Sequence, residues 1–373
     1  MVSLQDIATI NPKSDPLQNT FIYIDLEAVE KGELRKIQEI MREEAPSRAQ
    51  RVIDNNDILF QCVRPYQKNN YIHRILNTSN QQWVASTGYA QIRTTELPNY
   101  IYHLLNTDEF NRKVMVRCTG SSYPAINSED LATIHLYYTP DKKEQLKISR
   151  LLDLLDKRIA TQNKIIEKLQ SLIKGLIDDI ITLKCGQLVA FETLYSKAGE
   201  GGTPTTSNTE FYDNGSIPFI KIDDLSNKYL SANKDYITEL GLKKSSAWLI
   251  PTHSIIYSNG ATIGAISINK YPVCTKQGIL GIVPNTNIDV EFLYYFMQSS
   301  YFQKEVERVV TEGTMKTAYL KDINHIKCPI PDLDRQKEIS HLLSVLSLKE
   351  DVERQLLQKY QIQKQYLLRK MFI

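Results

Sequence analysis

Residues 141–184 read DKKEQLKISRLLDLLDKRIATQNKIIEKLQSLIKGLIDDIITLK, a stretch with no proline and a single glycine, Gly175. Its apolar residues recur in alternating steps of four and three, and Gln162 stands where one of them is due. They are Ile148, Leu152, Leu155, Ile159, Ile166, Leu169, Ile173, Leu176 and Ile180. This heptad seam predicts a coiled-coil helix on the order of 60 Å long. A long amphipathic helix packed on its own domain is the alternative.

A second segment repeats the first. Residues 332–373 are also free of proline and glycine, and RQKEISHLL near their start corresponds to EQLKISRLL. Their apolar seam is less regular, because Glu353 and Lys364 interrupt it. Each helix follows a proline, Pro140 or Pro331, and the flanks correspond as well: TGSSYPAINSEDLATIHLYYTP to EGTMKTAYLKDINHIKCPIP, and DILFQCVRPYQKN to SIIYSNGATIGAISINK. These correspondences predict an internal duplication.

The duplication implies an α+β chain in the order globule, helix, globule, helix. We place the first globule at 1–140, the first helix at 141–185, the second globule at 186–331 and the second helix at 332–373. The second helix can bury its apolar stripe on the first only by running back antiparallel. The expected fold is two globular α/β domains separated by two long helices that form an antiparallel coiled coil, with pseudo-twofold internal symmetry.

Composition is that of an ordinary globular protein, with 42% apolar and 24% charged residues. No apolar run reaches the roughly 18 residues of a membrane-spanning helix, and the N-terminus lacks the pattern of a secretory signal. The cysteines form no CxxC pair and suit reduced thiols in a cytoplasm. They are Cys62, Cys118, Cys185, Cys274 and Cys328. With a net charge of +2, a DNA-binding chain needs locally concentrated positive charge or a partner.

Known catalytic motifs do not occur. The Gly-rich stretch EGGTPTTSNTEFYDNGSIPFIKIDDL at 200–225 is not a phosphate-binding loop, because no lysine follows its glycines before Lys221. A dinucleotide fingerprint, HExxH and Gly-x-Ser-x-Gly are all missing, and the histidines show no metal-ligand spacing. Asp332 reads as a helix cap rather than the start of a nuclease motif. The sequence therefore predicts no active site and no metal site.

Polar turns in both globules carry side chains suited to DNA. Arginine can contact guanine with two hydrogen bonds, Asn or Gln can do so with adenine, and lysine mainly contacts phosphate. Paired glycines permit close backbone approach. A solvated loop is the alternative for the first turn, and a solvent-exposed strand-end lysine is the alternative for Lys221. The candidates are Arg64, Tyr66, Gln67, Lys68, Asn69 and Asn70 in the first globule, and Gly201, Gly202, Thr203, Lys221, Ser258, Asn259, Thr262, Asn269, Lys270, Lys276 and Gln277 in the second.

These motifs together resemble the specificity (S) subunits of type I restriction–modification systems. The resemblance lies in Gly-Gly-Thr-Pro followed by IPFIKIDDL, in SNGATIGAISINK, in the Glu-Gln at 144–145, and in ILFQCVRPYQKN followed by WVASTGYAQIR. It covers essentially the whole chain. The chain departs from the family at Arg335-Gln336, where Glu-Gln is common, and at YYTP, where Ile-Pro-x-Pro is usual.

The resemblance implies a non-catalytic DNA reader in the cytoplasm. Each globule would be a target recognition domain that reads one half of a bipartite, asymmetric site, and the helices would set the spacer. Two methylation (M) subunits would dock around the helices and bind S-adenosylmethionine, and restriction (R) subunits would bring ATP and Mg²⁺. This chain itself would bind no cofactor. The alternatives are the specificity subunit of a two-component system with a fused methyltransferase–nuclease partner, a coiled-coil scaffold without DNA function, and an enzyme acting alone.

Overall fold

The computed structural model describes residues 1–74, 81–182, 186–311 and 316–372. The chain divides into two compact units, one of residues 1–163 and 355–373 and the other of residues 164–354. The division falls within the two long helices, α5 (Lys142–Thr182) and α10 (Leu333–Met371), so each helix contributes a segment to each unit. None of the helices in the described ranges is long and apolar enough to cross a membrane.

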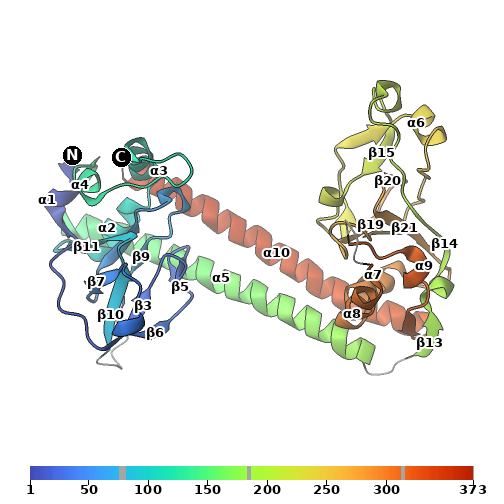
Figure 1. Cartoon of the computed structure of the whole chain (residues 1–373), viewed down its shortest axis with the longest axis horizontal. Coiled ribbons are helices and arrows are strands. Elements are labelled where there is room, and N and C mark those ends of the chain that lie inside the picture. Colours follow the sequence, from blue (N-terminus) through green and yellow to red (C-terminus); the bar gives the residue numbers. More distant parts are fainter. Residues whose placement is uncertain (75–80, 183–185, 312–315, 373) are drawn as a thin grey trace. The chain divides into compact units, whose positions relative to one another are not determined.

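Unit 1 contains two four-stranded sheets (Figure 1). In one sheet all neighbouring strands are antiparallel, and in the other β3 and β10 run parallel. The first has the order β2 (Ala8–Ile10), β11 (Tyr89–Thr94), β8 (Ile58–Gln61), β9 (Tyr71–Ile72), and the second the order β6 (Gln38–Met41), β3 (Thr20–Ile24), β10 (Gln82–Ser86), β7 (Ala49–Ile53). The smaller elements are β1 (Val2–Ser3) paired with β12 (His135–Leu136), β4 (Val29–Glu30) paired with β5 (Glu33–Leu34), and the helices α1 (Leu4–Ile7), α2 (Pro98–Leu105), α3 (Asp108–Arg117) and α4 (Ser128–Ala132).

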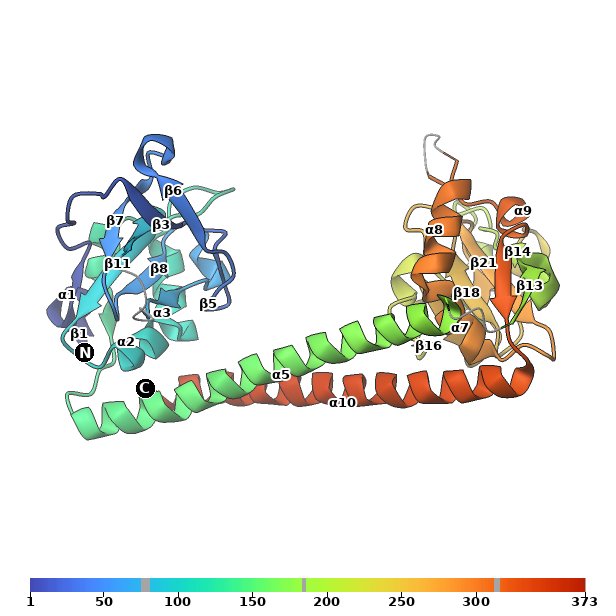
Figure 2. The same ribbon diagram turned by 90° about the horizontal axis from the view of Figure 1, so that it is seen from below.

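Unit 2 repeats this plan, with a five-stranded and a three-stranded sheet (Figure 2). The larger has the order β14 (Tyr195–Glu200), β21 (Ile279–Pro284), β18 (Ile255–Ser258), β19 (Ile266–Asn269), β16 (Tyr229–Leu230), and the smaller the order β17 (Asp235–Ile237), β15 (Ile217–Ile220), β20 (Cys274–Thr275). The other elements are β13 (Gln187–Ala190) paired with β22 (Lys327–Ile330), and the helices α6 (Glu239–Lys243), α7 (Val290–Gln298), α8 (Ser300–Val309) and α9 (Leu320–Ile323).

The duplication predicted from the sequence extends to single hydrogen bonds. In unit 1 the Cys62 amide donates to the Gly88 carbonyl, and the Cys62 carbonyl accepts from the Ile126 amide. In unit 2 the Asn259 amide donates to the Gly278 carbonyl, and the Asn259 carbonyl accepts from Ala318. The parallel pair β3–β10 corresponds to β15–β20, and the helices α2 and α3 correspond to α7 and α8. Both units thus hold the same turn in the same backbone frame.

Helix segments run antiparallel within each unit. In unit 1 Leu152 of α5 shares a buried core with Leu368 of α10, and Arg158 Nε donates to the Tyr360 hydroxyl at 3.1 Å. In unit 2 Ile177 of α5 shares a core with Ile339 of α10. Along α5 the seam residues are buried or half-buried as the heptad pattern predicts, and the side chain of Ile180 lies outside the described residues. The buried residues are Ile148, Leu152, Leu155 and Ile166, and the half-buried ones are Ile159, Leu169, Ile173 and Leu176.

Of the three polar residues that interrupt the apolar seams, Gln162 of α5 and Glu353 of α10 are buried, and Lys364 of α10 is half-buried. Gln162 is 4% exposed and Glu353 is 7% exposed. The Glu353 carboxylate pairs with Lys349 one turn earlier, and Lys364 pairs with Asp156 of α5. Since a buried polar residue in a coiled coil favours one register over others, these positions limit sliding of the seam at a cost in stability.

Both long helices begin two residues after a proline. Asp332 accepts a hydrogen bond from the Arg335 amide at 2.9 Å, and Asp141 accepts one from the Lys143 amide at 2.8 Å. A carboxylate at a helix start satisfies an amide that has no partner within the helix and interacts favourably with the helix dipole. Asp332 is therefore a helix cap, as the sequence predicts.

Candidate nucleic-acid interface

The first candidate loop connects β8 to β9 in unit 1. Arg64 and Lys68 both have a left-handed backbone, with φ of 54° and 53°, and they flank a short turn formed by residues 65–67. Tyr66 is 50% exposed and Gln67 is exposed. The Lys68 ammonium pairs with Asp108 of α3 at 2.8 Å, so this lysine is held within the domain. Tyr66 and Gln67 are therefore the most accessible side chains of the loop.

Asn70 supports this loop from inside. It is 2% exposed, its Oδ1 accepts from the Gln61 amide at 2.8 Å, and its Nδ2 donates to Asn106 at 3.1 Å. Gln61, also buried, accepts from the Asn69 amide at 3.0 Å and donates to Gln67 at 2.9 Å. Buried polar groups are stable only when paired, so Asn70 acts here as a support for the turn, and Gln61 is a supporting residue that the sequence analysis did not single out.

In unit 2 several candidate turns converge. Strands β15 and β20 run parallel, with Ile220 opposite Thr275, so Lys221 lies beside Lys276 at the ends of these strands. The Lys276 amide donates to the Ile220 carbonyl at 3.0 Å, and the Gln277 amide lies 3.4 Å from the Thr203 hydroxyl. Both Lys276 and Gln277 are exposed. The turn after β18 joins this cluster through the Asn259–Gly278 hydrogen bond and carries the exposed Thr262.

Lys221 forms an ion pair with a carboxylate of its own domain. Its ammonium pairs with Asp235 of β17 at 2.8 Å, and the side chain is 46% exposed. An exposed pair of this kind contributes little to stability, so a phosphate can compete with Asp235 for this lysine. Lys270, in contrast, follows β19 at the other end of the β18–β19 hairpin, where its ammonium lies 4.4 Å from the centre of the Tyr229 ring.

The glycines of the stretch 200–225 are required by packing inside the domain. A Cβ on Gly201 would lie 2.1 Å from the Thr275 carbonyl oxygen, and one on Gly202 would lie 2.2 Å from the Ser246 hydroxyl. The Gly201 amide donates to the Ile279 carbonyl at 2.9 Å and is not free to meet a ligand. The backbone of this loop thus lies against its own domain.

Three further candidates are interior residues. Ser258, Asn259 and Asn269 are each at most 1% exposed. The Asn269 amide group bonds the Ser254 amide and the carbonyls of Pro251 and Tyr271. The buried side chains of these residues hold the turns in shape, whereas neighbouring residues have side chains exposed at the surface.

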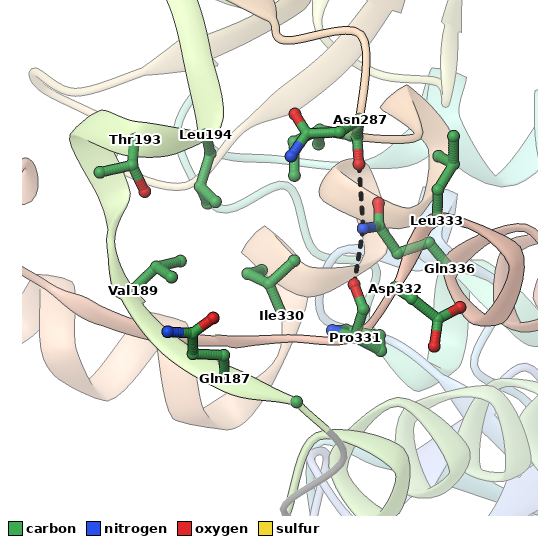
Figure 3. A pocket seen from close by; sticks show the side chains of 12 residues that line it. Gln187, Val189, Thr193, Leu194, Asn287, Ile330, Pro331, Asp332, Leu333 and Gln336 are labelled. Carbon is green, nitrogen blue, oxygen red and sulfur yellow. Dashed lines mark hydrogen bonds between the residues drawn. The ribbon is translucent and has the colours of Figure 1, made fainter.

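A glutamine fastens each long helix to its own domain. The Gln336 side chain of α10 donates to the carbonyls of Asn287 (3.2 Å) and Pro331 (2.9 Å) (Figure 3). It also accepts from the Asp289 amide at 2.9 Å. It adjoins a hollow of about 610 Å³ at the helix start. Gln145 of α5 donates likewise to the Thr139 carbonyl at 2.8 Å. The departure from the family pattern at Arg335-Gln336 therefore keeps the glutamine that makes these contacts.

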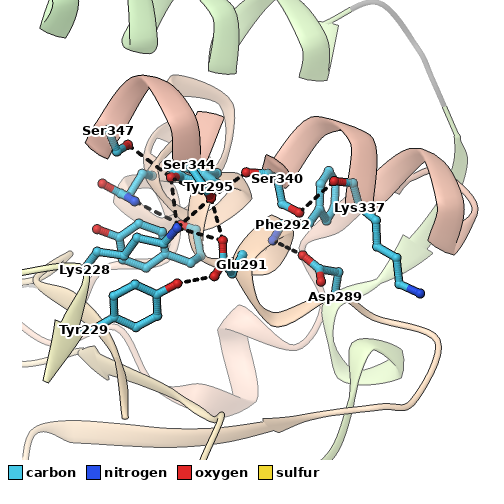
Figure 4. Close-up of polar contacts among 12 residues, drawn as sticks. Lys228, Tyr229, Asp289, Glu291, Phe292, Tyr295, Lys337, Ser340, Ser344 and Ser347 are labelled. Carbon is cyan, nitrogen blue, oxygen red and sulfur yellow. Dashed lines mark hydrogen bonds and ion pairs between the residues drawn. The ribbon is translucent and has the colours of Figure 1, made fainter. Parts of the chain in front are cut away.

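Charged clusters anchor the domains to the helices. In unit 2 Lys228 contacts Glu291 of α7 and Ser344 of α10, each at 2.8 Å, and donates to the Tyr295 hydroxyl at 3.1 Å (Figure 4). Burial disfavours the charge of Lys228, but the bonds to Glu291 and Tyr295 outweigh it and raise the pKa of Lys228. In unit 1 His103 bonds Asp153 of α5 at 2.8 Å. Sequence reasoning missed these long-range pairs.

Within the described ranges, no group of three or more His, Cys, Asp and Glu residues could hold a metal ion. Cys62, Cys274 and Cys328 are buried, and burial raises the pKa of the Cys62 thiol to about 12. A thiol that stays protonated at neutral pH is a poor nucleophile. Cys185 lies outside the described residues.

His73 makes the stability of unit 1 depend on pH. Its ring is fully buried 4.9 Å from Trp83, and burial lowers its pKa to about 4. An unfolded chain has a histidine pKa near ~6.5, so between these values the unfolded state binds more protons. We therefore expect the free energy of unfolding to fall as pH drops from about 6.5 towards 4, by roughly 3 kcal/mol in total.

Thermal unfolding of wild type and His73→Phe at pH 7 and pH 5 checks this expectation. The variant, which keeps an aromatic ring, should lose less of its melting temperature on acidification. His341→Phe, the same change at an exposed position on α10, should behave as wild type. Equal losses in all three proteins would contradict the assignment to His73.

The structure thus contains two copies of one domain, each with a cluster of polar turns in the same backbone frame but with different side chains. A family model described as the type I restriction modification DNA specificity domain matches residues 1–171 and 195–360. The chain therefore belongs to this family and carries two such domains.

Curated relatives and solved structures agree. The chain is 22% identical over 380 residues to the type I restriction enzyme HindI specificity subunit of Haemophilus influenzae, covering 80% of this chain and 79% of the relative. It is 28% identical to the EcoR124I/EcoR124II specificity subunit of Escherichia coli, covering 66% and 62%. A type I restriction–modification S subunit from M. genitalium superposes with a TM-score of 0.61 at 14% identity, covering 100% of this chain and 95% of that one. A chain from a study of type I complex assembly and conformational transition gives 0.64 at 19% identity, covering 100% and 96%.

Proposed function

We propose that this chain is the non-catalytic DNA sequence-recognition subunit of a type I restriction–modification complex. Each domain reads one half of a bipartite, asymmetric site, and α5 and α10 set the unspecified spacer between the halves. The observation that carries the proposal is the pair of equivalent turns: the backbone bonds of Cys62 and Asn259 correspond, whereas the side chains that follow them differ. Equal frames with unequal side chains suit two different half-sites.

The proposed domains follow the sequence division. Residues 1–140 and 186–331 are the target recognition domains, and residues 141–185 and 332–373 are the spacer helices. Two methylation subunits, which bind S-adenosylmethionine, dock around these helices, and the repetition of Gln145 as Gln336 supports two equivalent docking positions. Restriction subunits supply ATP- and Mg²⁺-dependent steps. The chain itself binds no cofactor, and the complex works in the cytoplasm.

Contacts to DNA come from the exposed and half-buried members of the candidate set other than Lys68, Asn69 and Lys270, whose side chains contact Asp108, the Lys31 amide and the Tyr229 ring. Lysines contact phosphates and supply affinity, and side chains with paired donors and acceptors contact base edges. The buried candidates hold the turns in place. The contacting residues are Arg64, Tyr66, Gln67, Thr203, Lys221, Thr262, Lys276 and Gln277.

A second candidate keeps the DNA-reading role but changes the partner: a two-component system in which methylation and cleavage are fused in one chain. The duplicated domains and helices suit it equally. The subunits that co-purify with the chain separate the two candidates, because a fused partner carries both activities on one polypeptide.

A gel-shift with the co-expressed methylation subunit tests the proposal. Fragments of host DNA that contain a methylated site should shift at lower protein concentration than fragments of equal length without one, and the difference should persist in moderate salt, where counterion release weakens non-specific binding. A coiled-coil scaffold without DNA function predicts no dependence on sequence, and that result would overturn the proposal.

A further inference from the structure

A basic hollow lies beside the first candidate turn. It measures about 970 Å³ and is lined by the guanidinium-bearing residues Arg35, Arg48 and Arg64, together with Gln67 and Tyr123. Arg35 is already neutralised, because it pairs with Glu33 at 3.0 Å and with Glu30 at 3.6 Å. The ion pairs of the described chain do not involve Arg64, although Glu27 also lines the hollow.

Arg64 is held in a costly arrangement. Its backbone is left-handed (φ 54°), and its amide donates to the Pro124 carbonyl at 2.8 Å. The guanidinium lies 4.2 Å from the centre of the Tyr123 ring. Its Nε atom is buried and has no hydrogen-bond partner within the described residues. Backbone strain recurs at functional sites, and an unpaired buried donor costs free energy, so the stability of the domain does not explain the arrangement of Arg64.

The shape of the guanidinium favours one kind of acceptor. Its donors lie in one plane and match the O6 and N7 atoms on the major-groove edge of guanine, and the Tyr123 ring, 4.2 Å away, supports it. A phosphate contact needs charge but no fixed plane. Tyr123 is 64% exposed, so a DNA groove can reach the pair. We propose that Arg64, positioned by Tyr123, contacts a guanine in the half-site read by the first domain; this inference rests on the proposed function.

The second domain lacks this device. Two residues after Asn259, the counterpart of Cys62, the chain has Ala261 where the first domain has Arg64. An alanine provides no hydrogen bond to a base edge. The guanine contact therefore belongs to one half-site alone, and variants of Arg64 affect that half without changing the other.

Methylation of a duplex library tests the inference. Each variant is expressed with the methylation subunit, and every base pair of the half-site assigned to residues 1–140 is substituted in turn. Arg64→Lys keeps the charge but loses the planar fork, and it should lower discrimination at one G·C pair by roughly 5- to 150-fold. Tyr123→Ala should relax the same pair, whereas Tyr123→Phe, which keeps the ring, should read it as wild type does.

Arg112→Ala, a change of an exposed arginine of α3 that pairs with Glu109, should alter no position. The inference is overturned if that half-site contains no G·C pair, if Arg64→Lys discriminates as wild type, or if methylation falls uniformly at every sequence, which marks a phosphate contact. A wild-type complex that methylates without any sequence preference would instead refute the proposed function.

Discussion

A chain whose residues 1–140 are replaced by the first domain of another specificity subunit should methylate a site with one new half and one original half. The reason is that unit 1 has its own hydrophobic core, formed by its sheet and helices together with segments of α5 and α10. Unit 2 has a separate core. The exchanged chain is expressed in a host together with its methylation subunit. Single-molecule sequencing of the host DNA then identifies the methylated sites and shows the sequence of both halves at once.

The exchanged domain must keep the contacts that residues 1–140 make with α5. His103 bonds Asp153 at 2.8 Å, and Thr139 accepts from Gln145 at 2.8 Å, so both contacts cross the boundary at residue 140. A donor domain with a histidine at the position of His103 is the matched choice, because an unpaired Asp153 would destabilise the junction. Any residue at position 139 supplies the backbone carbonyl that accepts from Gln145. The reciprocal exchange of residues 186–331 should change the other half alone. A change in both halves after either exchange would refute separate reading.

Local sequence patterns predicted most of the fold. The heptad spacing predicted the buried residues of α5, and the repeat of EQLKISRLL as RQKEISHLL predicted the duplication, in which Gln145 and Gln336 each donate to a backbone carbonyl just before their helix. The aspartate cap at Asp332 was equally visible. These features depend on residues within one or two helical turns, and the sequence carries them directly.

The roles of the loop residues depend on contacts with residues far away in the sequence, so the sequence patterns did not predict them. Asn70 and Gln67 look alike as polar turn residues, but Asn70 is buried because Asn106, far along the chain, completes its bonds. Lys221 meets Asp235 from another strand. Tyr123 was missed, although TGSSYP occupies the repeat position of EGTMK and its aromatic ring distinguishes the first copy from the second. Comparing the two copies residue by residue is the signal that would have found it.

Inserting one heptad after Asn163 in α5 and one after Arg354 in α10 should lengthen the spacer of the methylated site while both halves keep their sequence. Seven residues add about 10 Å of helix, which corresponds to roughly three base pairs. A heptad turns the seam by only about 20°, so the apolar faces stay matched. Both insertions are needed, because the helix segments are antiparallel within each unit and an insertion in one alone shifts its seam against the other.

The helical twist of DNA should weaken methylation by the chain with both insertions. Three base pairs rotate one half-site by roughly 100° relative to the other, which the small rotation of the coil does not match. The complex with both insertions should therefore methylate DNA more weakly than wild type. The sites that it does methylate should have the longer spacer. Mapping of methylated sites measures the preferred spacing, and insertion in α5 alone serves as the control, with loss of thermal stability expected. An unchanged spacing in the double insertion would show that the helices do not measure the distance between half-sites.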